Sequence, residues 1–291
     1  MLKTIMFTGL ALIAFSANSV LCRLALGEST IDAASFTIIR LLSGATVLLM
    51  IISASSAKKG FSSKGSWTAG FMLFLYATTF SFAYITLDTG TGALILFGSV
   101  QITMVLLSLI SGARLHFTEW LGISIAFSGF VYLILPGVTT PSLMGFVLMT
   151  IAGIAWGIYT LMGRGSNNPL MDTGYNFFRT IPLVVILLIV TISNANYSVE
   201  GVFLAVLSGG IASGVGYTIW YIALGGLSGM QAAALQLLVP VIAALGGVIF
   251  VSEDLTLRLF VSASLVLGGI LILILGKYYT AAPHSGSKHN T

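Results

Sequence analysis

Ten apolar runs, each about 18–20 residues long and separated by short polar turns, follow one another along this chain. A helix of that length crosses the hydrocarbon core of a bilayer, which is about 30 Å thick. Only 7% of the residues are charged, whereas soluble domains carry about 25%. The sequence therefore predicts an all-α integral membrane protein with ten transmembrane helices. Their expected limits are 4–22, 34–53, 67–86, 93–111, 119–136, 143–162, 175–192, 202–221, 231–250 and 257–276.

The first run has the outline of a secretory signal peptide, but its apolar part is long enough to cross the membrane. We therefore expect it to be the first transmembrane helix. Leu21 precedes Cys22, the single cysteine, at a position where a lipoprotein signal requires a small residue. We accordingly expect no lipidation. Residues 279–291 are expected to form a polar cytoplasmic tail.

The orientation follows from lysine and arginine, which accumulate in cytoplasmic loops. Eight of the 12 basic residues would share one side with both termini, two would lie opposite, and two lie within spans. The eight are Lys3, Lys58, Lys59, Lys64, Arg114, Arg164, Lys277 and Lys288, and the two opposite are Arg23 and Arg258. Both termini are therefore expected in the cytoplasm, with the protein in the inner (plasma) membrane. This topology accounts for the basic excess, so no nucleic-acid partner is expected.

A shift of 139 positions aligns the two halves of the sequence without gaps. It places Arg40 on Arg179 and residues 99–115 on 238–254. We therefore predict two repeats of five helices, residues 1–139 and 140–278. Because five is an odd number, the second repeat must enter the membrane from the opposite side. Inverted repeats of this kind are typical of secondary transporters.

Four segments carry a resemblance to a known family. They are RLLSGA (40–45), TGTGALILFG (89–98), AGIAWGIYTLMGR (152–164) and AAALQLLVPVIAALGGVIFVSEDLT (232–256). With these segments in this order, the chain resembles the drug/metabolite transporter superfamily, and within it the EamA-type transporters. It departs from the family pattern at Gln101, where the first repeat often has proline, and at Ser252-Glu253, which replace Gly-Glu.

The resemblance implies a secondary transporter that moves a small organic solute, such as an amino acid, a metabolite or a drug-like compound. It further implies alternating access between the two halves, and we expect export rather than uptake. The partners implied are a small-molecule substrate and the lipid bilayer.

Three amide side chains lie within predicted spans, where an unmet hydrogen-bonding group is costly. They are Asn18, Gln101 and Gln236. In the 139-residue alignment, Gln101 and Gln236 fall on equivalent stripes of the fourth and ninth spans, so an amide from each half would face one cavity. The alternative is that the amides only form hydrogen bonds between helices.

Aromatic rings with polar atoms gather on the third, sixth and eighth spans, and such rings suit organic solutes through stacking, cation–π contacts and hydrogen bonds. The rings predicted to contact substrate are Trp156, Tyr159, Tyr217 and Trp220. Tyr76, Phe80 and Tyr84 form a further stripe at a spacing of four residues. For rings near helix ends, such as Tyr84, a place in the interfacial belt or at a gate is the competing interpretation.

Arg40 and Arg179 lie inside predicted spans, roughly 9 Å and 6 Å from the helix starts. In an inverted repeat they would lie near opposite mouths. We expect each to be a gate or structural charge, paired with carboxylates or carbonyl groups near helix ends. The carboxylates expected are Asp32, Asp88 or Glu253 for Arg40, and Asp172 or Glu119 for Arg179. Substrate contact by one arginine, and snorkelling of the guanidinium to the headgroups, are the alternatives.

No catalytic site is expected at mid-depth. All three histidines lie in loops or the tail, and all eight carboxylates lie at or near span ends. Acids, bases or metal ligands therefore cannot assemble within the membrane, and the GxxxxGK[ST] nucleotide loop of ATP-driven pumps is missing. We expect no enzymatic activity, no cofactor and no metal ion.

Three alternatives stay open at this point. Energy coupling would use a terminal acid such as Asp88 or Glu119, or else the protein performs exchange or facilitated diffusion. The glycine-rich surfaces of the fifth and tenth spans offer a surface for a homodimer. The alternative function is that of a membrane scaffold or a lipid-handling protein without solute transport.

Overall fold

The computed structural model describes residues 2–54, 64–110, 112, 116–135, 141–163, 166–224, 226–227 and 235–281. Within these ranges the chain is helical and has no strand, only an isolated bridge between Ile31 and Tyr197. The elements are α1 (Leu2–Gly27), α2 (Ala33–Ala54), α3 (Trp67–Tyr84), α4 (Thr89–Ile110), α5 (Phe117–Ile134), α6 (Leu143–Gly163), α7 (Pro169–Thr191), η2 (Ile192–Asn194), α8 (Val199–Val206), η3 (Leu207–Val215), α9 (Gly216–Leu224), α11 (Leu238–Val251) and α12 (Leu257–Ala281).

The predicted fold class, an all-α membrane protein, is confirmed. Eight described helical stretches are long and apolar enough to cross a membrane. The two other predicted spans correspond to α3, which is rich in aromatic and hydroxyl side chains, and to α11, which has 14 residues. The ninth span was expected from residue 231, but 228–234 lie outside the described residues and α11 begins at Leu238, close to Pro240. The predicted tail lies outside the described residues from position 282 onward.

Helix α7 begins at Pro169, earlier than the predicted start at residue 175. The Asn168 side chain accepts a hydrogen bond from the Met171 N–H (3.2 Å), and Pro169 occupies the first turn. Asparagine before the helix and proline at its start both favour helix initiation. These two local signals extend the helix over residues that are too polar to count as part of an apolar run.

The eighth predicted span consists of three consecutive segments, α8, η3 and α9. Its middle segment, η3, has π-helical hydrogen bonding over nine residues, LSGGIASGV. Gly209 of η3 lies directly against α2, since a Cβ at this position would overlap the carbonyl oxygen of Arg40. The small residues of η3 therefore allow a close crossing with α2. Such π-segments occur frequently at functional sites.

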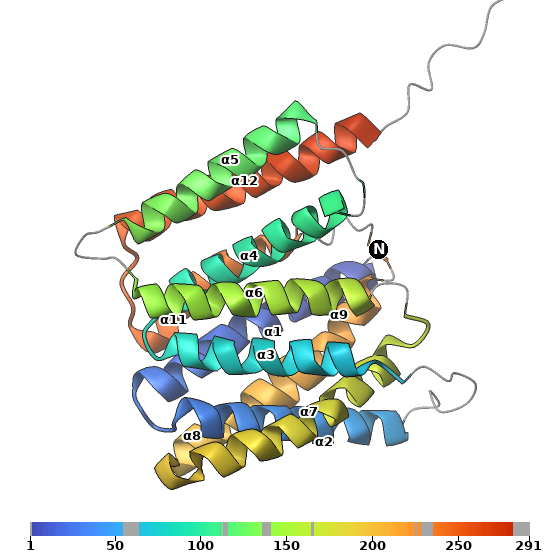
Figure 1. The fold of residues 1–291 in the computed structure, drawn as a ribbon, viewed down its shortest axis with the longest axis vertical. Helices are drawn as coiled ribbons and strands as arrows, with labels where there is room; N and C mark the ends of the chain where they lie inside the picture. Colours follow the sequence, from blue (N-terminus) through green and yellow to red (C-terminus); the bar gives the residue numbers. More distant parts are fainter. Residues whose placement is uncertain are drawn as a thin grey trace, which may run out of the picture.

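Figure 1 shows the helices lying side by side along their length, with α1 starting and α12 ending at the same end of the bundle. This agrees with an even number of spans. The assignment of that end to the cytoplasm stays a prediction.

Helices α5 and α12 pack along each other at one side of the bundle (Figure 1). Gly122 and Gly129 of α5 and Gly269 of α12 lie in this contact, where a Cβ would meet the backbone of the opposite helix. Small residues allow such close packing of helices in membranes. The glycines on which we based the expectation of a homodimer are therefore largely engaged within one chain.

The neighbours of each helix follow a regular pattern. Helix α2 packs on α7, α4 on α11 and α5 on α12, while α4 packs on α6 as α11 does on α1. These pairings are preserved when each of the first five spans is exchanged with its counterpart among the last five. The pattern is what two related halves would produce, and the inverted repeat with a boundary at residues 139–140 stays a prediction.

Candidate functional site

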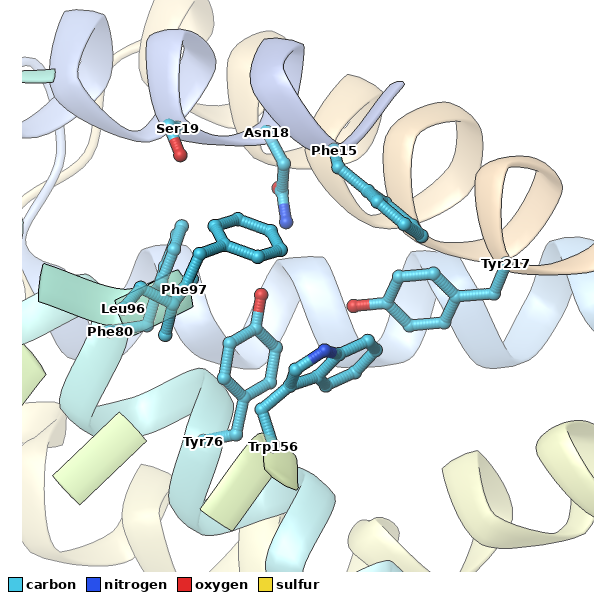
Figure 2. A pocket seen from close by; sticks show the side chains of 9 residues that line it. All are labelled: Phe15, Asn18, Ser19, Tyr76, Phe80, Leu96, Phe97, Trp156 and Tyr217. Carbon is cyan, nitrogen blue, oxygen red and sulfur yellow. The ribbon is translucent and has the colours of Figure 1, made fainter. Parts of the chain in front are cut away.

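A small central pocket lies between five helices and is shown in Figure 2. Three of the helices, α1, α3 and α4, belong to the first predicted repeat, and two, α6 and α9, belong to the second. The free volume is about 10 Å³, roughly the space of one water molecule. The side chains that line the pocket therefore nearly fill it. Its lining consists of Phe15, Asn18, Ser19, Tyr76, Phe80, Leu96, Phe97, Trp156 and Tyr217.

Trp156 of α6 is the centre of the aromatic wall. Its ring lies 4.8 Å from that of Tyr76 and 4.9 Å from that of Tyr217, and it stacks on Tyr159 at 5.4 Å with an interplanar angle of 28°. Phe15 contacts Tyr217 edge-on at 5.9 Å. Each such pair contributes about 0.5–1.5 kcal/mol beyond its buried area, so these contacts hold the rings in place around the pocket.

A contact with η3, which packs on α1, fixes the orientation of the Asn18 amide. The buried Ser208 hydroxyl of η3 donates a hydrogen bond to the Asn18 Oδ1. An amide whose oxygen accepts in this way turns its NH₂ group to the other side. Figure 2 shows the Asn18 nitrogen facing the pocket, together with the hydroxyls of Tyr76 and Tyr217 and the indole nitrogen of Trp156.

Arg40 lies behind the Tyr76 and Phe80 side of the pocket and is only 2% exposed. Its Nη2 donates to the Tyr76 hydroxyl oxygen (3.1 Å), and its guanidinium carbon lies 5.2 Å and 4.8 Å from the ring centroids of Tyr76 and Phe80. Its Nη1 is buried and has no hydrogen-bond partner among the described residues. This burial excludes snorkelling to the headgroups.

The acids that we expected beside Arg40 lie elsewhere. Glu253 and Asp88 form ion pairs with Arg23, at 3.1 Å and 3.6 Å. Asp32 binds backbone N–H groups at the start of α2. The expected pairing of Arg40 with a carboxylate is therefore wrong for the part of the chain that the structure describes. The physical reason is that Arg40 points inward to α3, whereas the acids lie at the helix ends.

The remaining predicted site residues are buried but do not line the pocket. Tyr159 supports Trp156 from behind, and Trp220 supports Phe15 at 5.7 Å. Gln101 lies four residues beyond the lining residue Phe97 on α4, which is one helical turn or about 6 Å along the axis. Gln236 precedes α11. Neither glutamine lines the pocket in this structure. That both contact the substrate stays a prediction.

The end of the bundle opposite the termini is held together by Arg23, a residue that the predicted limits place in a loop. Its Nε donates to the Glu253 Oε1 at 3.1 Å. The Glu253 carboxylate also accepts the backbone N–H of Thr89, the first residue of α4, at 3.0 and 2.8 Å. Glu253 thus connects the second predicted repeat to α1 and α4 of the first.

Asp32 forms a second connection at this end. Its carboxylate accepts the N–H groups of Ser35 and Asn196, both at 2.9 Å, and its own N–H donates to the Asn196 carbonyl (2.8 Å). Burial raises the pKa of Asp32, but the hydrogen bonds from Ser35 and Asn196 lower it by more, so the pKa lies below its usual value. The turn before α2 is in this way tied to the turn between α7 and α8.

At the end that carries the termini, Asp172 makes the corresponding connection. Its carboxylate, in the first turn of α7, accepts the N–H of Gly65 in the turn before α3 (2.7 Å). Asn176, four residues further on, accepts the N–H of Ser66 (3.0 Å). Each predicted half thus supplies one aspartate, at the start of its second helix, to a turn of the other half.

Arg179 strengthens the connection at this end. Its Nη1 donates to the carbonyl oxygens of Lys64 and Tyr175, the latter at 3.3 Å, and its guanidinium carbon lies 5.6 Å from the ring centroid of Trp67. Of the partners expected for Arg179, the structure shows the carbonyl groups, while the carboxylate of Glu119 accepts the backbone N–H of His116 (2.7 Å). The role of Arg179 as a gate or structural charge stays a prediction.

A larger apolar groove of about 610 Å³ lies between α4, α11 and α12. Its walls include Leu94, Pro240, Val241, Leu259 and Leu267, with Thr256 and Ser264 among the few polar lining residues. A surface of this kind fits hydrocarbon rather than a polar solute.

Several pocket residues were not predicted, although the sequence contains a signal for them. Phe15 and Ser19 were not named, yet they lie three residues before and one residue after the predicted Asn18, which places all three on one face of α1. Tyr76 and Phe80 belong to the aromatic stripe noted on the third span. The central pocket lies where these two stripes meet.

Comparisons with known proteins show which family the sequence resembles. The model of the EamA-like transporter family matches residues 143–275, from the start of α6 into α12. An uncharacterized protein of Pseudomonas aeruginosa is 43% identical over 280 residues, covering 96% of this chain and 97% of that protein. A probable amino-acid metabolite efflux pump of Escherichia coli K12 is 25% identical over 240 residues, covering 74% of this chain and 80% of the pump.

One further sequence and one solved structure also match most of the chain. An uncharacterized transporter of Archaeoglobus fulgidus is 25% identical over 204 residues, covering 69% of this chain and 73% of that protein. A protein of known crystal structure shares the fold with a TM-score of 0.62 at 18% identity, covering 94% of this chain and 99% of the other. The family model and the sequence relatives lead to one assignment: this chain belongs to the EamA-like transporter family.

Proposed function

We propose that this protein is a secondary transporter that moves a small organic solute through the central pocket by alternating access, and that it exports this solute across the inner membrane. The observation that carries the proposal is the pocket itself. Aromatic rings and polar donors from both predicted halves converge there at the middle of the bundle. Organic solutes bind in sites that combine an apolar wall with a few polar groups.

The contacts at the two ends support alternating access. Asp32 and Glu253 join the halves at one end, and Asp172 and Arg179 join them at the other. The side chains that line the pocket between them nearly fill it. We interpret the structure as a state closed at both ends, from which either set of contacts opens in turn. Export is supported by the efflux pump among the relatives.

The test is transport in proteoliposomes that contain the purified protein and a labelled panel of amino acids and metabolites. We expect movement of at least one solute, and a roughly tenfold loss with Trp156→Ala, because this ring has three aromatic partners in the pocket. Trp120→Ala is the matched control, since Trp120 is exposed on α5. Equal losses in both variants would contradict the assignment of the pocket.

One observation favours the alternative, a lipid-handling protein. The groove between α4, α11 and α12 is apolar and, at about 610 Å³, large enough for an acyl chain. The same proteoliposomes decide between the two functions when they also contain a fluorescent phospholipid. Lipid movement between leaflets without transport of any solute would support lipid handling and contradict the carrier.

A further inference from the structure

We propose that the central pocket recognises the carboxylate of an organic acid or amino acid, with Arg40 as the source of the positive field and Tyr76 as the hydroxyl that contacts the anion. This inference rests on the proposed transport function and adds the chemical class of the substrate to it. It concerns one anionic group on a solute whose remaining part is apolar or aromatic.

The first step is the charge of Arg40. A guanidinium stays protonated in proteins, and this one is 2% exposed. The ion pairs of the described residues join Asp88 and Glu253 to Arg23, and none of them includes Arg40. A buried charge without a counterion is expensive. Two aromatic faces and one hydroxyl stabilise it only in part.

The second step is the unused capacity of this guanidinium. Its Nη1 is buried and lacks a hydrogen-bond partner among the described residues. A buried donor without an acceptor costs about 1–3 kcal/mol. Arg40 is not itself among the pocket-lining residues, so an anion in the pocket would balance this charge through the Tyr76 hydroxyl, which lines the pocket and accepts from Arg40.

The third step concerns the polar atoms that reach the pocket. The Tyr76 oxygen accepts from Arg40, which leaves its hydrogen to donate elsewhere. The Asn18 oxygen is occupied by Ser208, so its NH₂ group faces the pocket, and the Trp156 nitrogen can only donate. These three groups present donors to the pocket, the hydroxyls of Ser19 and Tyr217 can donate or accept, and the described lining contains no carboxylate. A site of donors beside a positive charge favours an anionic acceptor over a cation or an amide.

The experiment measures binding of matched acid and amide pairs to the purified full-length protein at pH 7. The probes are 3-phenylpropionate and 3-phenylpropionamide, 4-methylpentanoate and 4-methylpentanamide, and L-phenylalanine and L-phenylalaninamide. Thermal shift and quenching of tryptophan fluorescence report binding, since Trp156 lines the pocket. We expect acids to bind at least tenfold more tightly than their amides in one or more pairs.

Variants then assign the preference to Arg40. Arg40→Met and Tyr76→Phe are expected to bring the acid-to-amide ratio close to one, whereas Arg40→Lys retains a reduced preference. The matched control is Arg179→Gln, because Arg179 occupies the equivalent position in the other predicted repeat but bonds to backbone carbonyls at the mouth. It should leave the ratio unchanged.

Stability separates recognition from a structural role. Replacing an unpaired buried charge by an apolar side chain is often neutral or stabilising, so Arg40→Met should keep or raise the melting temperature. A clear fall in melting temperature with an intact acid preference would overturn the proposal, and if Arg40→Met does not fold, Tyr76→Phe decides. Equal binding of acids and amides by the wild type would overturn it while transport stands. No binding of any probe, together with no solute movement in proteoliposomes, would overturn both.

Discussion

The Nε of Arg23 lies 3.1 Å from Oε1 of Glu253, and this ion pair joins α1 to the turn before α12. Both side chains are mostly buried, with 20% and 13% exposed. The contact lies at the end of the bundle opposite the termini and connects the two predicted halves.

Glu253→Gln should loosen this end of the bundle. The substitution removes the negative charge from Arg23 and weakens the acceptor for the Thr89 N–H. A loss of one kcal/mol or more in the closed state corresponds to about a fivefold change in population. We expect labelling of a cysteine introduced at Ala25, which is buried at this end of α1, in a Cys22→Ala background, to rise by about that factor. Asp254→Asn, an exposed neighbour, is the control and should leave the labelling rate unchanged.

Asp172→Ala should produce the opposite effect. This substitution removes the acceptor for the Gly65 N–H at the end that carries the termini. A cysteine introduced at Ser66 is expected to become more accessible, while a cysteine at the buried Ala25 becomes less accessible because the open states compete. If both positions became more accessible together, local unfolding rather than alternating access would be indicated.

Acidification should weaken the connection made by Asp32. Its pKa in the folded protein lies below the ordinary value of 3.8, so the folded state binds this proton less readily than the unfolded chain does. The stabilisation is complete above the unfolded pKa and is lost as the pH falls through the folded pKa. We expect the difference in melting temperature between wild type and Asp32→Asn to shrink as the pH is lowered below about 4. A constant difference would show that the charge of Asp32 is not involved.

Ser252→Gly should stabilise the protein. Ser252 ends α11 in the left-handed region, with φ 58° and ψ 34°, a conformation that is unfavourable by roughly 1–2 kcal/mol for residues with a Cβ. Glycine adopts this conformation without the penalty. The penalty that is removed exceeds the entropy that glycine adds to the unfolded chain, so the folded state gains stability overall. We expect a rise of a few degrees in the melting temperature. Ser252→Val should lower it, and the reverse order would exclude backbone strain as the cause.

The sequence predicts the helices well because an apolar run must find a partner surface or lipid over its full length. It predicts helix ends less well. Arg23 was placed in a loop because the apolar run stops at residue 22, yet α1 continues to Gly27. The hydrogen bonds of the backbone extend a helix beyond its apolar part, and this extension brings Arg23 to Glu253.

The candidate site was predicted in part. Asn18, Trp156 and Tyr217 line the pocket, since a polar group at mid-helix needs a partner in the interior. Gln101 and Gln236 meet the same criterion but are not among the residues that line the pocket. An alignment of repeats gives equivalent positions along the chain, and the rotation and depth of each helix are set by packing. For the same reason, Arg40 and Arg179 are equivalent in sequence but have different surroundings.

The π-helical segment η3 links the register of the backbone to the shape of the pocket. A change from i→i+5 to i→i+4 hydrogen bonding shifts the following helix by one residue, which is a rotation of about 100°. Such a rotation would carry Tyr217 of α9 away from Trp156 and would also move Ser208 relative to Asn18. A local rearrangement of a few backbone hydrogen bonds would thus change which aromatic rings line the pocket. It would need no rigid-body movement of either half of the protein.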